Sequence, residues 1–382
     1  MFKSLERLLK RALLATLRLI VGSRTIPTPL PASFQRILVV RQHNQLGDML
    51  CAVPLLRALR SRFPSSHIAL IASPVNYDVM QNLRYLDELI CFDKLQFTKS
   101  GISGVQRLLG FIKELRRTRF DLAIVPSTVS TSFTSDLLAY LAGAPVRIGI
   151  GSIDDRENPS GLLYNVPVHV KWSASPRRHQ TLRNLDVGSP LSLSTEDLGH
   201  EMTLTSSEVD EAKSWFDSRI NHFGSAIAIH PSAGKVSNRW PMDRFAELAA
   251  ELSKEFNLKL FVTCGPMDVQ VVDALVCTLN VPVEVIQNQS IRRVASYLGQ
   301  MDLVISNDTG IMHVAAAVGT PVLSLFGPTD AAQWAPIGAK NRYIVGKDGR
   351  MDSITLEEVH EQARSMMRDA MRSETARHGK PC

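Results

Sequence analysis

The sequence lacks closely spaced cysteines. It has 5 in 382 residues, they form no CxxC pair, and several lie in apolar runs. An odd number of scattered cysteines argues against a disulfide framework and against a zinc site. We therefore expect reduced thiols and a cytosolic protein.

A long uncharged apolar run is also missing. The most apolar terminal stretch, residues 2–21, is interrupted by Arg18, and no small-residue cleavage site follows it. It is too short and too charged for a membrane-spanning helix, and it makes a poor signal peptide.

Acidic residues are scarce only at the N-terminus. Residues 1–35 hold six lysines and arginines against Glu6 alone, a net +5 out of +6 for the whole chain. The remaining residues are therefore nearly neutral as a group, which argues against a nucleic-acid-binding body.

Residues 2–21 alternate basic and apolar positions at helical spacing, which predicts a basic amphipathic helix. A proline-rich linker, Ile26–Pro31, follows it. We expect a peripheral anchor on an anionic membrane face. A helix packed on the body, a frayed terminus and a transit peptide remain alternatives.

The rest of the chain alternates short apolar strands with helices. The length suggests two or three domains, and 45% hydrophobic residues suffice for large cores. The alternation predicts an α/β protein with parallel, doubly wound sheets. A helix is expected over Met49–Phe63, and a last helix over Ile354–Met371 is a candidate to pack back on the first domain.

The strand and helix pattern weakens between about 151 and 222, where prolines recur. We therefore expect two Rossmann-like domains facing a cleft. The predicted segments are a terminal segment and linker 1–35, an acceptor-side domain 36–175, an interdomain region 176–222, a nucleotide-sugar-binding domain 223–345 and a C-terminal helix and tail 346–382.

The most informative stretch is Asp302–Asp330. Its pattern predicts a strand, a polar turn at 307–310, a small-residue helix and a second buried strand. Ligands of open parallel sheets sit at the carboxyl ends of the strands, and a helix N-terminus favours an anion such as a diphosphate. A phosphate-facing site is expected here.

Three motifs together carry a family resemblance. They are LGDMLCAVPLLRALR at 46–60, HPSAG with NRWP at 230–241, and NDTGIMHVAAAVGTPVLSLFGPTD at 307–330. The set resembles glycosyltransferase family 9, the lipopolysaccharide heptosyltransferases. The resemblance implies a GT-B-type fold and an inverting enzyme that moves a heptose from ADP-heptose to a hydroxyl of the lipopolysaccharide core.

Asp48 is the candidate general base. It follows Gly47 after the first predicted strand and begins a helix. A capping carboxylate is the plain structural interpretation. The resemblance implies instead that Asp48 takes the proton of the acceptor hydroxyl.

The candidate donor-binding residues lie in the second predicted domain. By resemblance, Asp308 contacts the donor sugar and Thr309 and Gly310 hold the diphosphate. The other candidates, in the two loops and at the first turn of the helix, are Ser232, Ala233, Gly234, Lys235, Asn238, Arg239, Gly265 and His313. Thr329 and Asp330 are weaker candidates beside the same turn.

One position departs from the family pattern. Family members often have a lysine two residues before the Trp-Pro pair, and this chain has Asn238 there. Because a leaving nucleoside diphosphate needs its charge offset, Lys235 or Arg239 is expected to substitute.

The resemblance implies no cofactor and no metal ion. The implied partners are a nucleotide-sugar, a lipid-linked core oligosaccharide and an anionic membrane on the inner face of the cytoplasmic membrane, with no nucleic acid. Arg57, Arg60 and Lys94 could meet acceptor phosphates, although solvated surface charges are the simpler interpretation. The alternatives are a nucleotide-sugar epimerase of the same fold, a transferase using another nucleotide-sugar, and a non-catalytic sugar-binding protein.

Overall fold

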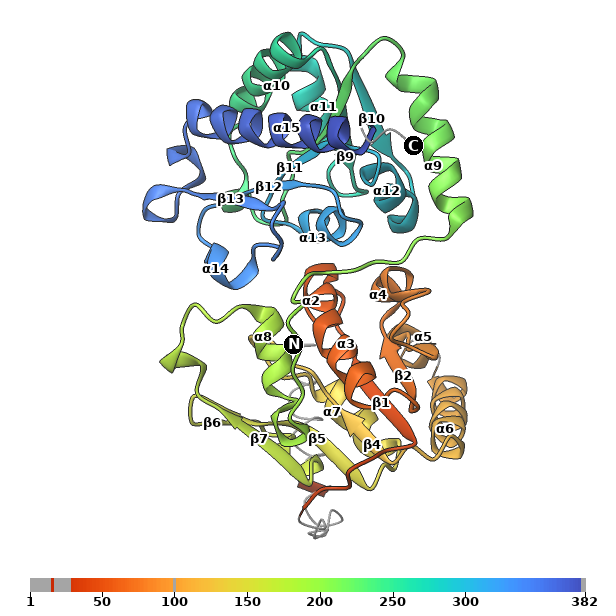
Figure 1. Ribbon diagram of the computed structural model, residues 1–382. Helices are drawn as coiled ribbons and strands as arrows, with labels where there is room; N and C mark the ends of the chain where they lie inside the picture. Colours follow the sequence, from red (N-terminus) through yellow and green to blue (C-terminus); the bar gives the residue numbers. More distant parts are fainter. Residues whose placement is uncertain (1–14, 17–28, 99–100, 379–382) are drawn as a thin grey trace. The chain divides into compact units, whose positions relative to one another are not determined.

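A computed structural model describes residues 15–16, 29–98 and 101–378 (Figure 1). The chain divides into two compact α/β units with one sheet each. Unit 1 extends to Tyr77 and resumes over Leu83–Asp197, and unit 2 combines Asp78–Asn82 with Leu198–Cys382. The division after Asp197 falls inside the predicted interdomain region 176–222.

The sheet of unit 1 has the order β3-β2-β1-β4-β5 with all neighbours parallel. Two further strands pair with β5: the short β6 runs antiparallel to it and β7 runs parallel to it. The strands are β1 Arg36–Arg41, β2 His67–Ala72, β3 Glu88–Cys91, β4 Leu122–Ile124, β5 Val146–Ile153, β6 Arg156–Glu157 and β7 Val166–Val170.

Helices connect the parallel strands β1 to β5, as is usual for parallel pairs. They are α2 Leu46–Leu50, α3 Val53–Arg62, α4 Pro74–Met80, α5 Lys94–Thr98, α6 Gly101–Arg117 and α7 Phe133–Leu141, and α8 Gln180–Asp186 follows β7. Leu115 of α6 and Leu138 of α7 pack with Leu38 and Val40, the β1 side chains on one face of the sheet. Successive strand residues point to opposite faces, so these two helices cover that face.

The single helix predicted over Met49–Phe63 is wrong in one respect, because two helices occupy it. Helix α2 ends at Leu50, and α3 begins at Val53 with Pro54 in its first turn. Proline has no N–H to donate and fits only the start of a helix, so the second helix begins just before it.

The sheet of unit 2 has the order β10-β9-β8-β11-β12-β13 and is parallel throughout. It repeats the strand order of unit 1 without a matching sequence repeat. The strands are β8 Ser225–His230, β9 Leu258–Cys264, β10 Val283–Gln287, β11 Leu303–Asn307, β12 Val322–Phe326 and β13 Arg342–Val345.

Two hydrophobic clusters cover the two faces of this sheet. Ile227 and Ile229 of β8 pack in one cluster with α10, α11 and α15, and Ala226 and Ala228 pack in the other with α9, α12 and α13. The unit is therefore doubly wound, as predicted. Its helices are α9 Ser206–Ile220, α10 Met242–Phe256, α11 Val269–Thr278, α12 Ile291–Leu298, α13 Gly310–Ala317, α14 Ala331–Trp334 and α15 Leu356–His378.

The last helix does not return to the first domain, contrary to the prediction. Val359, Ala363 and Met367 of α15 are buried in the cluster that contains α10. Figure 1 shows α15 beside α10, and Trp240 Nε1 donates to the Ile354 carbonyl just before α15 at 2.9 Å. The apolar face of α15 is therefore buried within unit 2.

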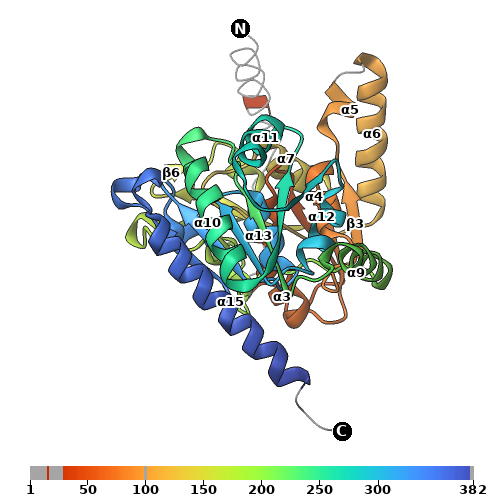
Figure 2. The ribbon, with the colours of Figure 1, turned by 90° about the horizontal axis from the view of Figure 1, so that it is seen from above.

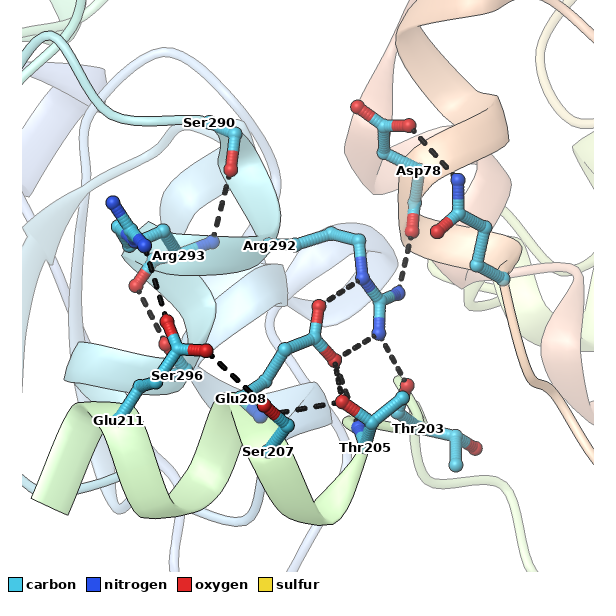
Figure 3. Close-up of polar contacts among 11 residues, drawn as sticks. Asp78, Thr203, Thr205, Ser207, Glu208, Glu211, Ser290, Arg292, Arg293 and Ser296 are labelled. Atoms are coloured by element: carbon cyan, nitrogen blue, oxygen red, sulfur yellow. Dashed lines mark hydrogen bonds and ion pairs between the residues drawn. The ribbon is translucent and has the colours of Figure 1, made fainter.

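Helix α9, which the sequence pattern did not predict, is held by a buried arginine (Figure 3). Arg292 of α12 donates to both carboxylate oxygens of Glu208 at 2.5 and 2.6 Å. Its other hydrogen bonds go to the carbonyls of Thr203 and Asp78. The hydrogen bond and charge of Arg292 lower the pKa of Glu208 to about 2.

The predicted amphipathic helix at 2–21 lies outside the described residues except for Ala15 and Thr16. Across the residues that the structure does describe, no helix is long and apolar enough to cross a membrane. Four cysteines fall in that part of the chain, Cys51, Cys91, Cys264 and Cys277, and none of the four forms a disulfide there.

Candidate functional site

Asp48 is buried at the carboxyl ends of β1 and β4 in unit 1, held by two donors. Arg41, the last residue of β1, donates from Nη2 to Asp48 Oδ1 at 3.0 Å, and the Thr128 hydroxyl donates to the same oxygen at 2.6 Å. Arg41 also binds the carbonyls of Asp48 and Pro126. This buried guanidinium fixes the carboxylate and offsets its charge.

The second carboxylate oxygen of Asp48 is available. In the described part of the chain, no hydrogen bond reaches Oδ2, and Oδ2 is not among the fully buried polar atoms left without a partner. One oxygen is thus locked in place and the other can accept a proton. This division suits a general base, which needs both a fixed orientation and a free lone pair.

Two of the three basic residues considered for acceptor phosphates are structural. Arg57 is buried and donates to the Tyr85 hydroxyl at 2.9 Å and to the Asp197 carbonyl at 2.6 Å. Arg60 binds the carbonyls of Ser66 and Tyr85 and forms an ion pair with Asp87. The solvated-charge interpretation is therefore wrong for Arg57, because its guanidinium ties α3 to two loops. Lys94 is exposed.

In unit 2, the loops after β8, β11 and β12 meet around Asp308. The Asn238 amide donates to Asp308 Oδ2 at 3.0 Å and to the Thr329 hydroxyl at 3.3 Å. Burial raises the pKa of Asp308, while hydrogen bonds from Thr329 and Asn238 and the charge of Lys235 act in the opposite direction. Three loops that are distant in the sequence thus present one polar cluster.

Asn307 joins two of these loops. Its side-chain oxygen accepts from the Trp240 N–H at 3.1 Å, and its amide donates to the Pro231 carbonyl at 2.7 Å. Asn307 is fully buried, so these bonds form without competition from water. It positions the residue after it, Asp308, against the loop that carries Asn238.

The turn before α13 is capped by a threonine. Thr309 is the N-cap residue, and its hydroxyl accepts from the Ile311 N–H at 3.3 Å. Helix α13 begins at Gly310, so its positive end lies beside Asp308. This arrangement suits an anionic ligand.

Lys235 and Arg239, the two predicted substitutes for a phosphate-binding lysine, differ in their surroundings. Arg239 is partly buried, and its Nε donates to the Ala233 carbonyl at 2.9 Å, which braces the loop 233–239. Lys235 is exposed beside Gly234, forms no ion pair with any residue in the described ranges, and lies close enough for its charge to act on Asp308. Lys235 is the better placed cation.

Ser232 and Gly265 are linked by Asp268, which was not among the predicted site residues. The Ser232 hydroxyl donates to Asp268 Oδ1 at 2.5 Å, and the Gly265 N–H donates to Oδ2 at 3.0 Å. The Ser232 proton is therefore used within the protein. Two features of the sequence could have indicated this link. Ser232 directly follows His230-Pro231 at the end of one predicted strand, and Asp268 lies three residues after Gly265 at the end of another.

His313 lies on α13 in unit 2. It is buried, its Nδ1 lies 3.4 Å from Nδ1 of His200, and the two ring centroids are 5.0 Å apart. Its placement at the mouth of the site stays a prediction.

A protein-family model decides the assignment: glycosyltransferase family 9 (heptosyltransferase) matches residues 108–363, more than half of the chain. The chain belongs to this family. The predicted family and enzyme class are therefore confirmed. As a family 9 glycosyltransferase, it carries the described polar cluster and the Asp48 site in separate units.

Characterised relatives cover most of the chain. Lipopolysaccharide heptosyltransferase 2 of Escherichia coli is 26% identical over 324 residues, which is 81% of this chain and 87% of the relative. The lipopolysaccharide core heptosyltransferase OpsX of Haemophilus influenzae is 22% identical over 312 residues, which is 81% of this chain and 84% of the relative.

Solved structures confirm the predicted GT-B fold. A family 9 glycosyltransferase from Veillonella parvula superposes with a TM-score of 0.77 at 21% identity, covering 88% of this chain and 98% of that chain. The E. coli ADP-heptose heptosyltransferase II gives 0.72 at 21% identity, covering 88% and 99%.

Proposed function

We propose that this family 9 glycosyltransferase transfers a heptose from ADP-heptose to a hydroxyl of the lipopolysaccharide core, with inversion at the anomeric carbon. The names of the relatives support the reaction class, and E. coli heptosyltransferase WaaC, which shares the fold, has been solved with ADP and with ADP-2-deoxy-2-fluoro heptose. The observation that carries the proposal is Asp48, with one oxygen locked and the other free.

We assign the two substrates to different domains. The domain 223–345 takes the donor and 36–175 takes the acceptor, while 1–35, 176–222 and 346–382 are the terminal segment, the interdomain region and the C-terminal helix and tail. The Asp308 cluster supports this assignment because it places a carboxylate for sugar hydroxyls beside the positive end of α13.

In the proposed reaction, the acceptor oxygen attacks the anomeric carbon from the face opposite the leaving group. The new C–O bond forms as the bond to the phosphate oxygen breaks, and the hydroxyl proton moves to Asp48 Oδ2. ADP leaves with the electron pair. Because attack and departure occur on opposite faces, the anomeric configuration inverts.

The leaving ADP carries additional negative charge that must be offset. We assign this role to the Lys235 ammonium and to the backbone at Thr309 and Gly310, with Ala233 and Gly234 forming the facing loop. Asn238 and Arg239 shape that loop, and Ser232 and Gly265 are held by Asp268. The reaction as proposed uses no metal ion, so excess EDTA should leave turnover unchanged.

We further propose that the enzyme works peripherally on the cytoplasmic membrane, on the inner face, where a lipid-linked acceptor is reached. The net +5 of residues 1–35 supports this location. Liposome flotation of the full chain with and without anionic lipid tests it, and equal recovery with neutral vesicles would contradict it.

Donor turnover tests the function itself. ADP-heptose and UDP-sugars are incubated separately with the enzyme, with and without core lipid, and nucleoside diphosphate release is measured. Release that requires ADP-heptose and core lipid together is the expected result. Sugar isomers without acceptor would indicate an epimerase, release with a different nucleotide-sugar would change the donor, and binding without turnover would indicate a sugar-binding protein.

A further inference from the structure

Basic residues are concentrated in one segment of unit 1. Residues 94–119 contain seven lysines and arginines and one acid, Glu114. Residues 36–382 as a whole are nearly neutral, so the rest of the body is net acidic and this segment is an exception. The net charge of residues 36–382 taken together does not reveal this basic segment.

The segment forms two helices that lie side by side, α5 and α6 (Figure 2). One side of α6 is fastened to the unit 1 core. Leu115 is buried there, and Leu108 and Phe111 pack against the same cluster, where Phe111 contacts the rings of Phe92 and Phe97. The aromatic rings of this region are thus occupied in packing.

A second flank of α6 exposes aliphatic side chains. Val105 and Leu109 are 57% and 60% exposed, and their spacing of four residues puts them on neighbouring turns of one flank. Leu95 of α5 is 56% exposed. Single exposed aliphatic residues are common, but three in a short helical pair with this charge are unusual.

Basic side chains surround the aliphatic flank. Lys113 is exposed one turn beyond Leu109, and Arg116 falls between Val105 and Leu109 in the angular order of the helix. Arg116 is exposed while its Nε donates to the Leu141 carbonyl at 2.8 Å, which fixes its direction. Arg117 is also exposed and pairs with Glu114 at 3.2 Å.

We propose that the α6 basic face, defined as Val105, Leu109, Lys113, Arg116 and Arg117, docks on an anionic phospholipid surface. Aliphatic side chains between lysines and arginines match the interface of such a bilayer, where apolar groups enter the acyl boundary and cations meet the headgroup phosphates. A single-stranded nucleic acid is a poorer match because the face exposes no aromatic ring for base stacking.

This inference rests on the proposed function in one respect, the lipid-linked acceptor, and it adds a contact surface on the folded body to the terminal segment. Two weak membrane contacts on one chain bind cooperatively because the first raises the effective concentration of the second. The face therefore strengthens membrane binding without needing to suffice alone.

The test compares full-length proteins by flotation with phosphatidylcholine vesicles that contain or lack phosphatidylglycerol. We expect Val105→Glu/Leu109→Glu to reduce partition onto anionic vesicles about tenfold or more, since it removes two insertable side chains and adds two negative charges. Lys113→Glu/Arg117→Glu should cause a loss of similar size that disappears at high salt.

The matched control is Val209→Glu, which charges another exposed helical valine, 40% exposed on α9 in unit 2. This control should partition like the unsubstituted protein. All variants should keep the melting temperature of the unsubstituted protein. Partition of the double glutamate variant equal to that of the unsubstituted protein would overturn the proposal. Stronger retention by single-stranded DNA than by vesicles, lost in the same variants, would overturn the lipid assignment.

Turnover with a lipid-free core oligosaccharide separates this inference from the proposed function. The double glutamate variant should keep that turnover and lose membrane binding. If neither the unsubstituted protein nor the variants transfer heptose to any acceptor, the proposed function is wrong. The flotation result still tests the membrane-docking proposal in that case.

Discussion

The Asn238 amide donates a hydrogen bond of 3.0 Å to Oδ2 of Asp308. The family resemblance implies a lysine at this position, so a neutral donor stands where a cation was expected beside this carboxylate. Burial raises the pKa of Asp308, and an amide opposes that effect less strongly than an ammonium group at the same place. We propose that the exposed Lys235, three residues earlier in the same loop, supplies the positive charge.

Asp48→Asn should reduce heptose transfer about 10²–10⁴-fold while ADP binding stays unchanged. The amide keeps Oδ1 as an acceptor for Arg41 and Thr128 but cannot take a proton. Single-turnover kinetics and calorimetric titration with ADP measure the two effects. The comparison variant is Thr128→Val, which loosens the carboxylate and should cost much less. Full activity of Asp48→Asn would remove Asp48 from the mechanism.

Lys235→Gln should weaken ADP binding about tenfold, the order expected for one charge-assisted contact to a phosphate. The salt dependence of binding should weaken with it because one charge is lost. Lys254→Gln, which changes an exposed lysine on α10, is the control and should bind ADP normally. Equal affinities of both variants would assign the diphosphate charge to another group.

Asn238→Asp should weaken binding of the donor tenfold or more, because it places a second carboxylate against Asp308. The two acids would share a proton, so binding should recover as the pH is lowered. Asn238→Lys, which provides the family's residue, should bind at least as well as the natural chain. Titrations at several pH values check both, and a pH-independent Asn238→Asp affinity would contradict the account.

Arg292→Met should destabilise unit 2 by about 2–3 kcal/mol, somewhat less than the loss of one partner from a fully buried ion pair. The change leaves Glu208 and the carbonyls of Thr203 and Asp78 without their donor. Urea denaturation measures the difference. The control is the neighbouring residue: Arg293→Met removes an exposed ion pair with Glu211 and should cost less than about 1 kcal/mol.

The free energy of unfolding in acid should depend on the ionisation of Glu208. Its pKa is lowered to about 2 from 4.5, so its contribution is complete above pH 4.5 and is lost as the pH falls from 4.5 towards 2. The difference in unfolding free energy between the natural chain and Glu208→Gln should therefore shrink over that interval. A difference that stays constant between pH 7 and pH 3 would show that Arg292 does not stabilise the ionised form.

Sequence patterns predicted best where local structure is strongly periodic. The two strands, the turn and the helix predicted within Asp302–Asp330 were found close to their expected positions. Helix α9 was missed although Thr205 and Glu208 form a capping box at its start, since prolines upstream suggested an irregular region. Helix α15 was expected over Ile354–Met371 and is observed over Leu356–His378, but the unit it packs on depended on contacts that no local pattern contains.

Site residues divide in the same way. Asp48, Asp308 and Thr309 belong to motifs whose spacing places them at strand ends. Asp268, Arg41 and Thr128 act through partners 36, 7 and 80 positions away in the chain. His313 was expected at the mouth because a helical turn allows it, and its neighbour His200, 113 positions away in the chain, was not predicted.

The sequence by itself determined the fold class, the family and the turns that end each strand, because these depend on periodicity and on residues a few positions apart. Tertiary structure alone decided which oxygen of Asp48 is free, that Asn238 is bound to Asp308, that Arg57 is structural and that α6 exposes a basic aliphatic flank. Each of these four features depends on burial and on partners that the folding of the sheets brings together. Burial and long-range partners cannot be predicted from residues that are neighbours in the sequence.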